Sequence, residues 1–84
     1  MLPHPLPRNV LLVSRDRTQV DTLRDQLHAQ GHVVEVAAGK ASALALFFEA
    51  GGHEWVFLGS DLPEDEARAL AASLREVEAS VLVL

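Results

Sequence analysis

The residues best placed to do chemistry follow the apolar run 55–58, where the chain reads Gly59-Ser60-Asp61. The carboxylate of Asp61 could hold a divalent cation or accept a phosphoryl group, and Ser60 is a further possible contact there. A continuously apolar run indicates a strand buried on both faces, as in the centre of a parallel sheet. Because sites in such sheets form at the carboxyl ends of the strands, we expect this loop to lie at the site.

A second loop, Ser14-Arg15-Asp16, is expected to meet the first at the same end of the sheet. Arg15 could replace a metal by pairing with Asp61 or Asp16 across the crevice, or it could be an exposed arginine whose pairing contributes about 0–1 kcal/mol. Asp16 is predicted to cap the following helix, with Gln19 reaching back in a capping box. Asp61 is expected to point into solvent or to begin the third helix, which disfavours a rescued metal or phosphate site.

Other polar residues do not form a recognisable site. A phosphate-binding loop at residues 39–42 would need a glycine where Val34 stands. His28 and His32 are separated by Gly31 and do not share a helix face, so a histidine metal site is not expected. We predict no cofactor, no metal and no catalytic residue, and therefore no enzymatic activity.

The composition is that of a small globular domain. The chain has 84 residues, of which 49% are hydrophobic and 23% charged, and it has no cysteine. Its apolar runs fall short of the roughly 20 residues of a membrane helix. The net charge of −5 comes with scattered basic residues, whereas nucleic-acid binding requires clustered cations. We predict a cytoplasmic domain that contacts neither a membrane nor nucleic acid directly.

Apolar periodicity predicts strands at residues 10–13, 32–37, 55–58 and 80–84, separated by helices that follow Asp16, Lys40 and Pro63. Gly31 is expected to end the first helix as a left-handed cap. The second helix is predicted over residues 41–50. The predicted inner side chains include Phe47, Phe48 and Val77. Residues 1–8 are predicted to be a flexible Pro-rich leader before a domain of residues 9–84.

Strands that alternate with helices over short connections predict a parallel α/β sheet with right-handed crossovers. Glu35 interrupts the valines of the second strand, so that strand is placed at an edge. An edge position favours the strand order 2-1-3-4 of a three-layer, flavodoxin-like fold.

Over residues 9–84 the chain resembles the receiver domain of bacterial two-component response regulators. The resemblance is carried by the segments 9–13, 23–34, 37–44 and 55–58 and by Leu62-Pro63. In that family an acidic pair holds Mg²⁺ and an aspartate accepts the phosphoryl group. The corresponding positions are Ser14, Arg15 and Gly59. The resemblance therefore implies a pseudo-receiver that cannot be phosphorylated, because glycine has no nucleophile.

A complete receiver has five strands and five helices, so the resemblance also implies a domain that is incomplete at the fifth strand. The fourth strand, Val81-Leu82-Val83-Leu84, is then left as an apolar edge. Exposed strand edges pair readily with other chains. We therefore expect these residues to contact a partner protein or a second copy of the chain.

Two functions remain open. The first is a regulatory protein–protein interaction module of a signalling or transcription-regulating protein, acting through self-association. The alternative is a module that binds a small anion or other small ligand in the crevice, where Arg15 and backbone N–H groups offer donors. A closed crevice favours the first function, and an ordered pocket beside Arg15 favours the second.

Overall fold

A sheet of four parallel strands forms the centre of the structure, a computed structural model that describes residues 8–49, 51–78 and 80–84. The strands lie side by side in the order β2-β1-β3-β4. They are β1 (Asn9–Val13), β2 (Val33–Ala37), β3 (Trp55–Leu58) and β4 (Leu82–Val83). The predicted parallel α/β sheet is confirmed, and the polar second strand lies at an edge as predicted.

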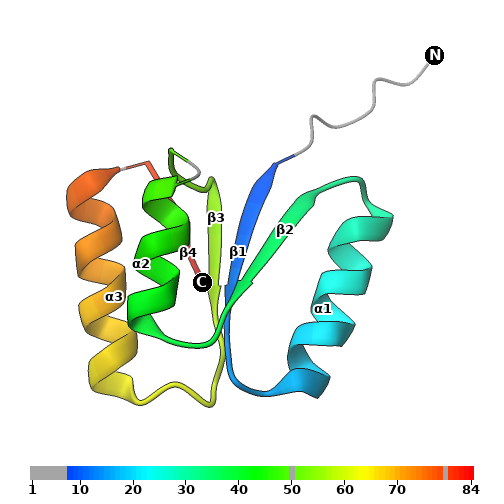
Figure 1. The fold of residues 1–84 in the computed structure, drawn as a ribbon, viewed down its shortest axis with the longest axis horizontal. Coiled ribbons are helices and arrows are strands. Elements are labelled where there is room, and N and C mark those ends of the chain that lie inside the picture. Colours follow the sequence, from blue (N-terminus) through cyan, green and yellow to red (C-terminus); the bar gives the residue numbers. More distant parts are fainter. Residues whose placement is uncertain (1–7, 50, 79) are drawn as a thin grey trace.

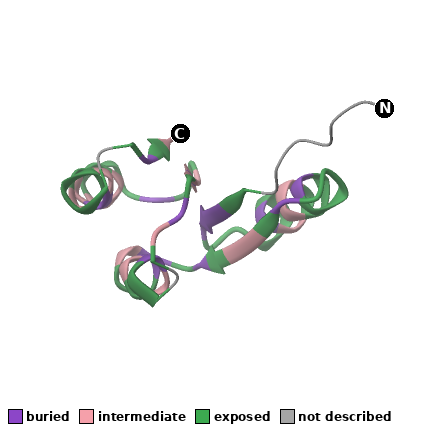
Figure 2. Cartoon of the chain, turned by 90° about the horizontal axis from the view of Figure 1, so that it is seen from above, coloured by how far each residue is buried: buried purple, intermediate pink, exposed green. Residues whose placement is uncertain are grey.

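Helices cover both faces of this sheet (Figure 1). α1 (Arg17–Ala29) lies on one face, whereas α2 (Lys40–Glu49) and α3 (Glu64–Val77) lie together on the other, as the view from above also shows (Figure 2). The loops that follow β1, β2 and β3 therefore gather at one end of the sheet, the carboxyl end of its strands.

The sheet has a core on each face, because successive side chains of a strand point to opposite faces. The two cores differ in size. On the face of α2 and α3 a large cluster is buried: Leu11, Val13, Ala37, Ala43, Phe47, Val56, Leu62, Leu70, Leu74 and Val81. On the face of α1 the buried cluster is Val10, Leu12, Val20 and Leu27. Trp55 and Phe57 pack against this smaller cluster and remain half-buried.

The ends of α1 follow from local chemistry. The carboxylate of Asp16 accepts the N–H groups of Thr18 at 3.1 Å and Gln19 at 3.3 Å, which confirms the predicted cap. The prediction that Gln19 reaches back to complete the capping box is wrong, because the backbone N–H of Asp16 donates to Ser14 Oγ at 3.0 Å. Gly31 follows the helix with φ of +88°, the left-handed conformation that glycine adopts at little cost.

Some predicted inner side chains are exposed. Phe48 is 59% exposed and Val77 is 52% exposed, because Phe47 and Leu74 take the inward positions of their helices. α2 begins at Lys40, earlier than predicted. Ala50, predicted to be its last residue, lies outside the described residues.

The predicted leader lies outside the described residues except for Arg8. Arg8 belongs to the folded domain, since its guanidinium pairs with Glu54 Oε2 at 2.6 Å and lies 5.3 Å from the ring centre of Trp55. Within the described ranges, no helix is both long and apolar enough to cross a membrane.

Candidate functional site

Ser14 lies at the centre of the carboxyl end of the sheet. Its backbone N–H donates to Ala37 O at 2.9 Å, which extends the pairing of β1 with β2, and the residue is buried. Its hydroxyl donates to Asp61 Oδ1 at 2.6 Å and accepts the N–H of Asp16 at 3.0 Å. The hydroxyl has one proton, and Gln19 Oε1 lies farther away at 3.4 Å, so Asp61 receives it.

Asp61 is exposed to solvent, as expected, but its carboxylate also turns back over the crevice, and α3 begins only at Glu64. Its Oδ1 accepts the hydroxyl of Ser14, and its Oδ2 accepts the backbone N–H of Arg15 at 2.8 Å. These two hydrogen bonds, that of Ser14 first, hold the pKa of Asp61 below its ordinary value of 3.8. The carboxylate therefore connects the loop after β3 to the loop after β1.

Gly59 is left without room for a side chain. A Cβ atom at this position would lie 2.7 Å from Ser14 Cβ and 2.8 Å from Ser14 Oγ, and it would also overlap Asp61 Oδ1. Its φ is not in the left-handed region, so the obstacle is these neighbouring side chains rather than the backbone. The space above Gly59 is thus filled by Ser14 and Asp61.

The pairing hypothesis required the guanidinium of Arg15 to pair with Asp61 or Asp16. The guanidinium pairs with neither aspartate. It offers its backbone N–H to Asp61, while its side chain extends toward Glu66, with Nη2 at 3.8 Å from Oε1. The same Glu66 oxygen accepts the backbone N–H of Lys40 at 3.0 Å. Glu66 therefore accepts one of the N–H groups at the amino end of α2, where such groups attract anions.

The remaining predicted site residues are not brought into the crevice. Asp16 is committed to capping α1. Ser60 is exposed, and none of the side-chain hydrogen bonds found among the described residues involves it. The sequence reasoning missed Glu66, because three consecutive acids begin α3 and nothing in their order distinguishes the one that reaches Lys40.

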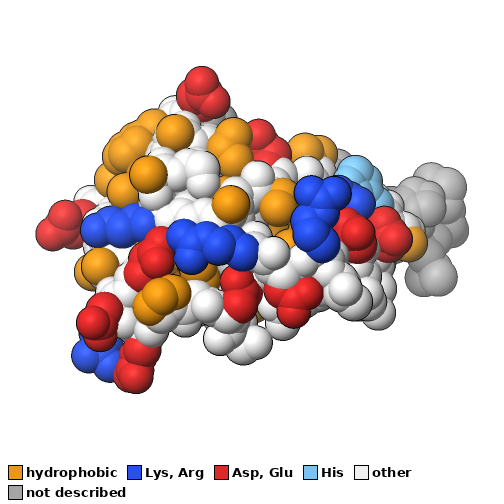
Figure 3. Space-filling model, turned by 60° about the horizontal axis from the view of Figure 1, so that its bottom comes forward, with side chains coloured by type: hydrophobic (Ala, Val, Ile, Leu, Met, Phe, Trp, Pro, Cys, Tyr) orange, Lys and Arg blue, Asp and Glu red, His pale blue; other side chains and the backbone are white. Residues whose placement is uncertain are grey.

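Charge at this end of the molecule is mixed. Basic and acidic side chains lie interspersed over the surface (Figure 3), as the contacts of Arg15 with Glu66 and Arg68 with Glu64 illustrate. Among the described residues, no three His, Asp or Glu side chains lie close enough together to hold a metal ion. Ser14 O–H, Arg15 N–H and Lys40 N–H already donate to carboxylates of the chain.

Three hollows adjoin the site. One, of about 410 Å³, is lined by Ser14, Arg15 and Arg17 among others. A cavity of about 190 Å³ opens beside Gly59, with a mainly apolar lining. Its lining includes Leu12, Ser14, Gln19, Val20, Leu23, Phe57 and Leu84. A wide, shallow hollow of about 650 Å³ lies beside Arg15 and includes Lys40 and Glu66. The half-open hollow beside Gly59 thus favours an apolar group, while the hollow near Lys40 already contains the carboxylate of Glu66.

The predicted interface segment divides between the two faces of the sheet. Val81 is buried, and Val83 is half-buried against the large cluster of α2 and α3. Leu82 and Leu84 are 48% and 56% exposed on the opposite face. Of the predicted interface residues, Leu82 and Leu84 therefore keep about half of their surface exposed.

Comparison with models of protein families, with curated proteins and with solved structures gives no match to this chain.

Proposed function

We propose that this chain is a pseudo-receiver, a module of receiver-like, flavodoxin-like fold that is not phosphorylated. It acts through protein–protein contacts, principally self-association, in a cytoplasmic signalling or transcription-regulating protein. One observation carries the proposal: the position matched to the phosphoacceptor is Gly59, and Ser14 and Asp61 fill the space above it.

Asp61 is a poor substitute for the missing acceptor. Each of its carboxylate oxygens accepts a hydrogen bond, and a carboxylate with a lowered pKa is a weaker nucleophile. Mg²⁺ prefers several oxygen ligands in octahedral geometry. Arg15 stands at a position matched to the metal-binding pair, and its positive charge opposes a cation there.

The same contacts explain how such a module would work without a switch. Asp61 ties the loop after β3 to the loop after β1, and Glu66 ties the start of α3 to the start of α2. Phosphorylation switches act by creating new charged contacts that bias a mobile segment. Here carboxylates of the chain already make such contacts, so the module is held in one state.

The alternative, binding of a small ligand in the crevice, keeps support from one observation. The cavity of about 190 Å³ beside Gly59 is large enough for a benzene-sized apolar group. An anion is less well matched, because it would have to displace Asp61 or Glu66 from the donors they already occupy. Ligand binding in this form would be apolar in character.

The test exposes the chain to a small acyl phosphate with Mg²⁺, followed by intact-mass measurement and by sedimentation over a concentration series. The expected result is no added phosphoryl group, together with concentration-dependent association that the treatment does not change. Asp61→Asn is the matched control, since it removes the nearest alternative acceptor. A phosphoryl group that is added to the natural chain and is lost in this variant would overturn the proposal.

A further inference from the structure

β2 is the edge of the sheet opposite β4, and among the described strands only β1 lies beside it. The backbone N–H of Val33 and the backbone C=O of Ala37 both form hydrogen bonds on the β1 side. Because the bonding groups of successive residues in a strand point to alternate sides, every second residue bonds toward β1. The N–H and C=O groups of Val34 and Val36 therefore point outward, where the described part of the chain places no strand.

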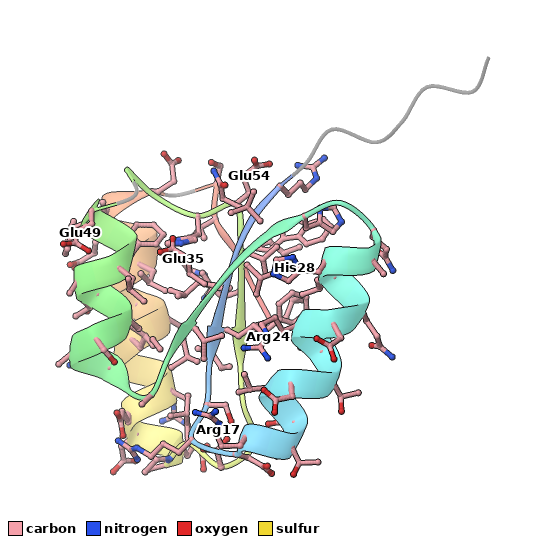
Figure 4. All side chains as sticks on the ribbon, turned by 45° about the vertical axis from the view of Figure 1, so that its right-hand side comes forward. Arg17, Arg24, His28, Glu35, Glu49 and Glu54 are labelled. Carbon is pink, nitrogen blue, oxygen red and sulfur yellow. The ribbon has the colours of Figure 1, made fainter. Side chains whose placement is uncertain are left out.

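A groove lies beside this edge on the α1 face of the sheet. It has a volume of about 410 Å³, and its lining includes Val36, Ala38, Arg17, Asp21 and Arg24. Val36 is 37% exposed. Figure 4 shows Arg17 and Arg24 on the side of α1 that faces β2. A strand added next to β2 would direct every second side chain to this side of the sheet, next to the groove.

The groove is rich in positive charge, whereas the chain as a whole carries a net charge of −5. Its charged lining consists of three arginines and one aspartate, namely Arg15, Arg17, Arg24 and Asp21. Asp21 pairs with Arg24 at 3.0 Å, and Glu66 lies 3.8 Å from Arg15. For Arg17, which is exposed, the described residues provide no ion pair. The groove therefore complements an acidic side chain.

The other face of the same edge favours an uncharged side chain. Val33 and Glu35 lie on this face, because side chains alternate along the strand. Val33 is 53% exposed, and the carboxylate of Glu35 lies 2.8 Å from His53 Nε2. Like charges directly opposite each other destabilise a strand pair, so an acid is disfavoured beside Glu35. A strand with acids on one face and apolar residues on the other matches both sides of the edge.

Other occupants match this edge less well. In antiparallel pairing of two copies about a two-fold axis, the α1 faces lie on the same side of the joined sheet, so the arginines of the two copies repel each other. Residues 1–7 of the chain contain no acid, and three of them are prolines, which have no backbone N–H to donate.

The geometry points to β2 as the docking edge for an extended, acidic segment of a partner protein, which adds to the sheet as a further strand and places its acids beside Arg17 and Arg24. In this mode of recognition, backbone hydrogen bonds supply affinity and alternate side chains supply specificity. The inference goes beyond the self-association proposed above and does not depend on it, because it uses the edge of the sheet opposite β4.

The first experiment measures, by fluorescence anisotropy, binding of a short labelled peptide in which Glu alternates with Val. Binding is expected to weaken as salt is added, and a peptide with Lys in place of Glu should not bind. Arg17→Glu should weaken binding on the order of tenfold or more, and an acid at the first residue of α1 is compatible with the helix. Arg68→Glu is the matched control, because it changes the net charge equally at an exposed position of α3 and should leave binding unchanged.

The second experiment tests the backbone of the edge. Val36→Pro removes an outward N–H at an edge position, where proline is tolerated, and should abolish binding. Val36→Thr keeps both the N–H and a β-branched side chain and should bind normally, while circular dichroism checks the fold of both variants. In the natural chain, the peptide should slow hydrogen exchange of the Val34 and Val36 amides, which needs no substitution.

Binding that is lost in Arg17→Glu but persists in Val36→Pro would overturn strand addition, because it would show an acid held in the groove without the edge. Equal binding of the Lys peptide, or no binding of the Glu peptide, would overturn the acidic partner. Sedimentation of Val36→Pro separates this inference from the proposed function. Loss of self-association in this variant would place a second copy at β2 and would overturn the inferred partner.

Discussion

The carboxyl end of the sheet and the α1 face of the sheet beside β4 differ in how far side chains of the chain itself occupy the groups that a partner could contact. At the carboxyl end, Asp61 and Glu66 accept hydrogen bonds that would otherwise be open to a ligand. Beside β4, Leu82 and Leu84 keep about half of their surface in contact with solvent.

This difference separates two ways in which a small α/β domain can meet a partner. Polar donors at strand ends bind anions only while they are free, and here side chains of the same chain have taken that role. An exposed apolar side chain cannot be matched by a hydrogen bond within the chain, because only burial removes its surface from water. The donors at the carboxyl end of the sheet are therefore occupied, whereas the partly exposed apolar side chains of the sheet are not fully buried.

The largest effect is expected from Gly59→Asp, which introduces the acceptor residue that the proposed receiver-like character would require. The new side chain would overlap Ser14 and Asp61, so the free energy of unfolding should fall by about 2–3 kcal/mol in urea titration. Addition of Asp61→Ala to this variant should return part of the loss, because it frees the occupied space. Full stability of Gly59→Asp alone would show that the crevice is open.

A smaller, pH-dependent effect is expected from Asp61→Ala. The pKa of Asp61 is lowered in the folded state, so its stabilisation is present in full above the ordinary value of 3.8 and is lost as the pH falls through the lower folded-state value. The unfolding midpoints of the natural chain and the variant should differ at pH 7 and begin to approach each other only as the pH falls below 3.8. Parallel pH profiles would contradict the hydrogen bonds assigned to this carboxylate.

The smallest effect is expected from Leu82→Ser on the α1 face of the sheet beside β4. Leu82 is 48% exposed, so at concentrations below dimerisation the free energy of unfolding should change by about 0.5 kcal/mol or less. Leu84→Ser serves as a second probe of the same surface and should behave alike. A loss as large as that of a buried leucine in the monomer would mean that another part of the fold covers this face.

Much of the architecture could be predicted from local patterns. The apolar runs predicted the strands, Asp16 and Gly31 predicted the ends of α1, and Glu35 placed β2 at an edge. These features depend on residues close together in the sequence. Phe48 and Val77 were assigned to the wrong side of their helices, because a helix with apolar residues around much of its surface does not reveal which of them faces the sheet.

The site was less predictable than the fold. The sequence predicted that Ser14, Arg15 and Gly59 would lie at the carboxyl end of the sheet. It did not predict that Asp61 hydrogen-bonds to Ser14 and Arg15, and it did not distinguish Glu66 from the other acids of α3. Asp61 reaches Ser14 across 47 positions of the chain, and Glu66 reaches Lys40 across 26. Such contacts depend on how crossovers place loops beside one another.

The residues alone therefore specify which donors and carboxylates the chain possesses and which segments form strands and helices. The tertiary structure decides which carboxylate meets which donor, and which half of the sheet is left without a helix of the described residues. The physical reason is the range over which each interaction acts. Capping, periodicity and turn preferences act over a few residues, whereas occupation of the space above Gly59 depends on packing between distant elements.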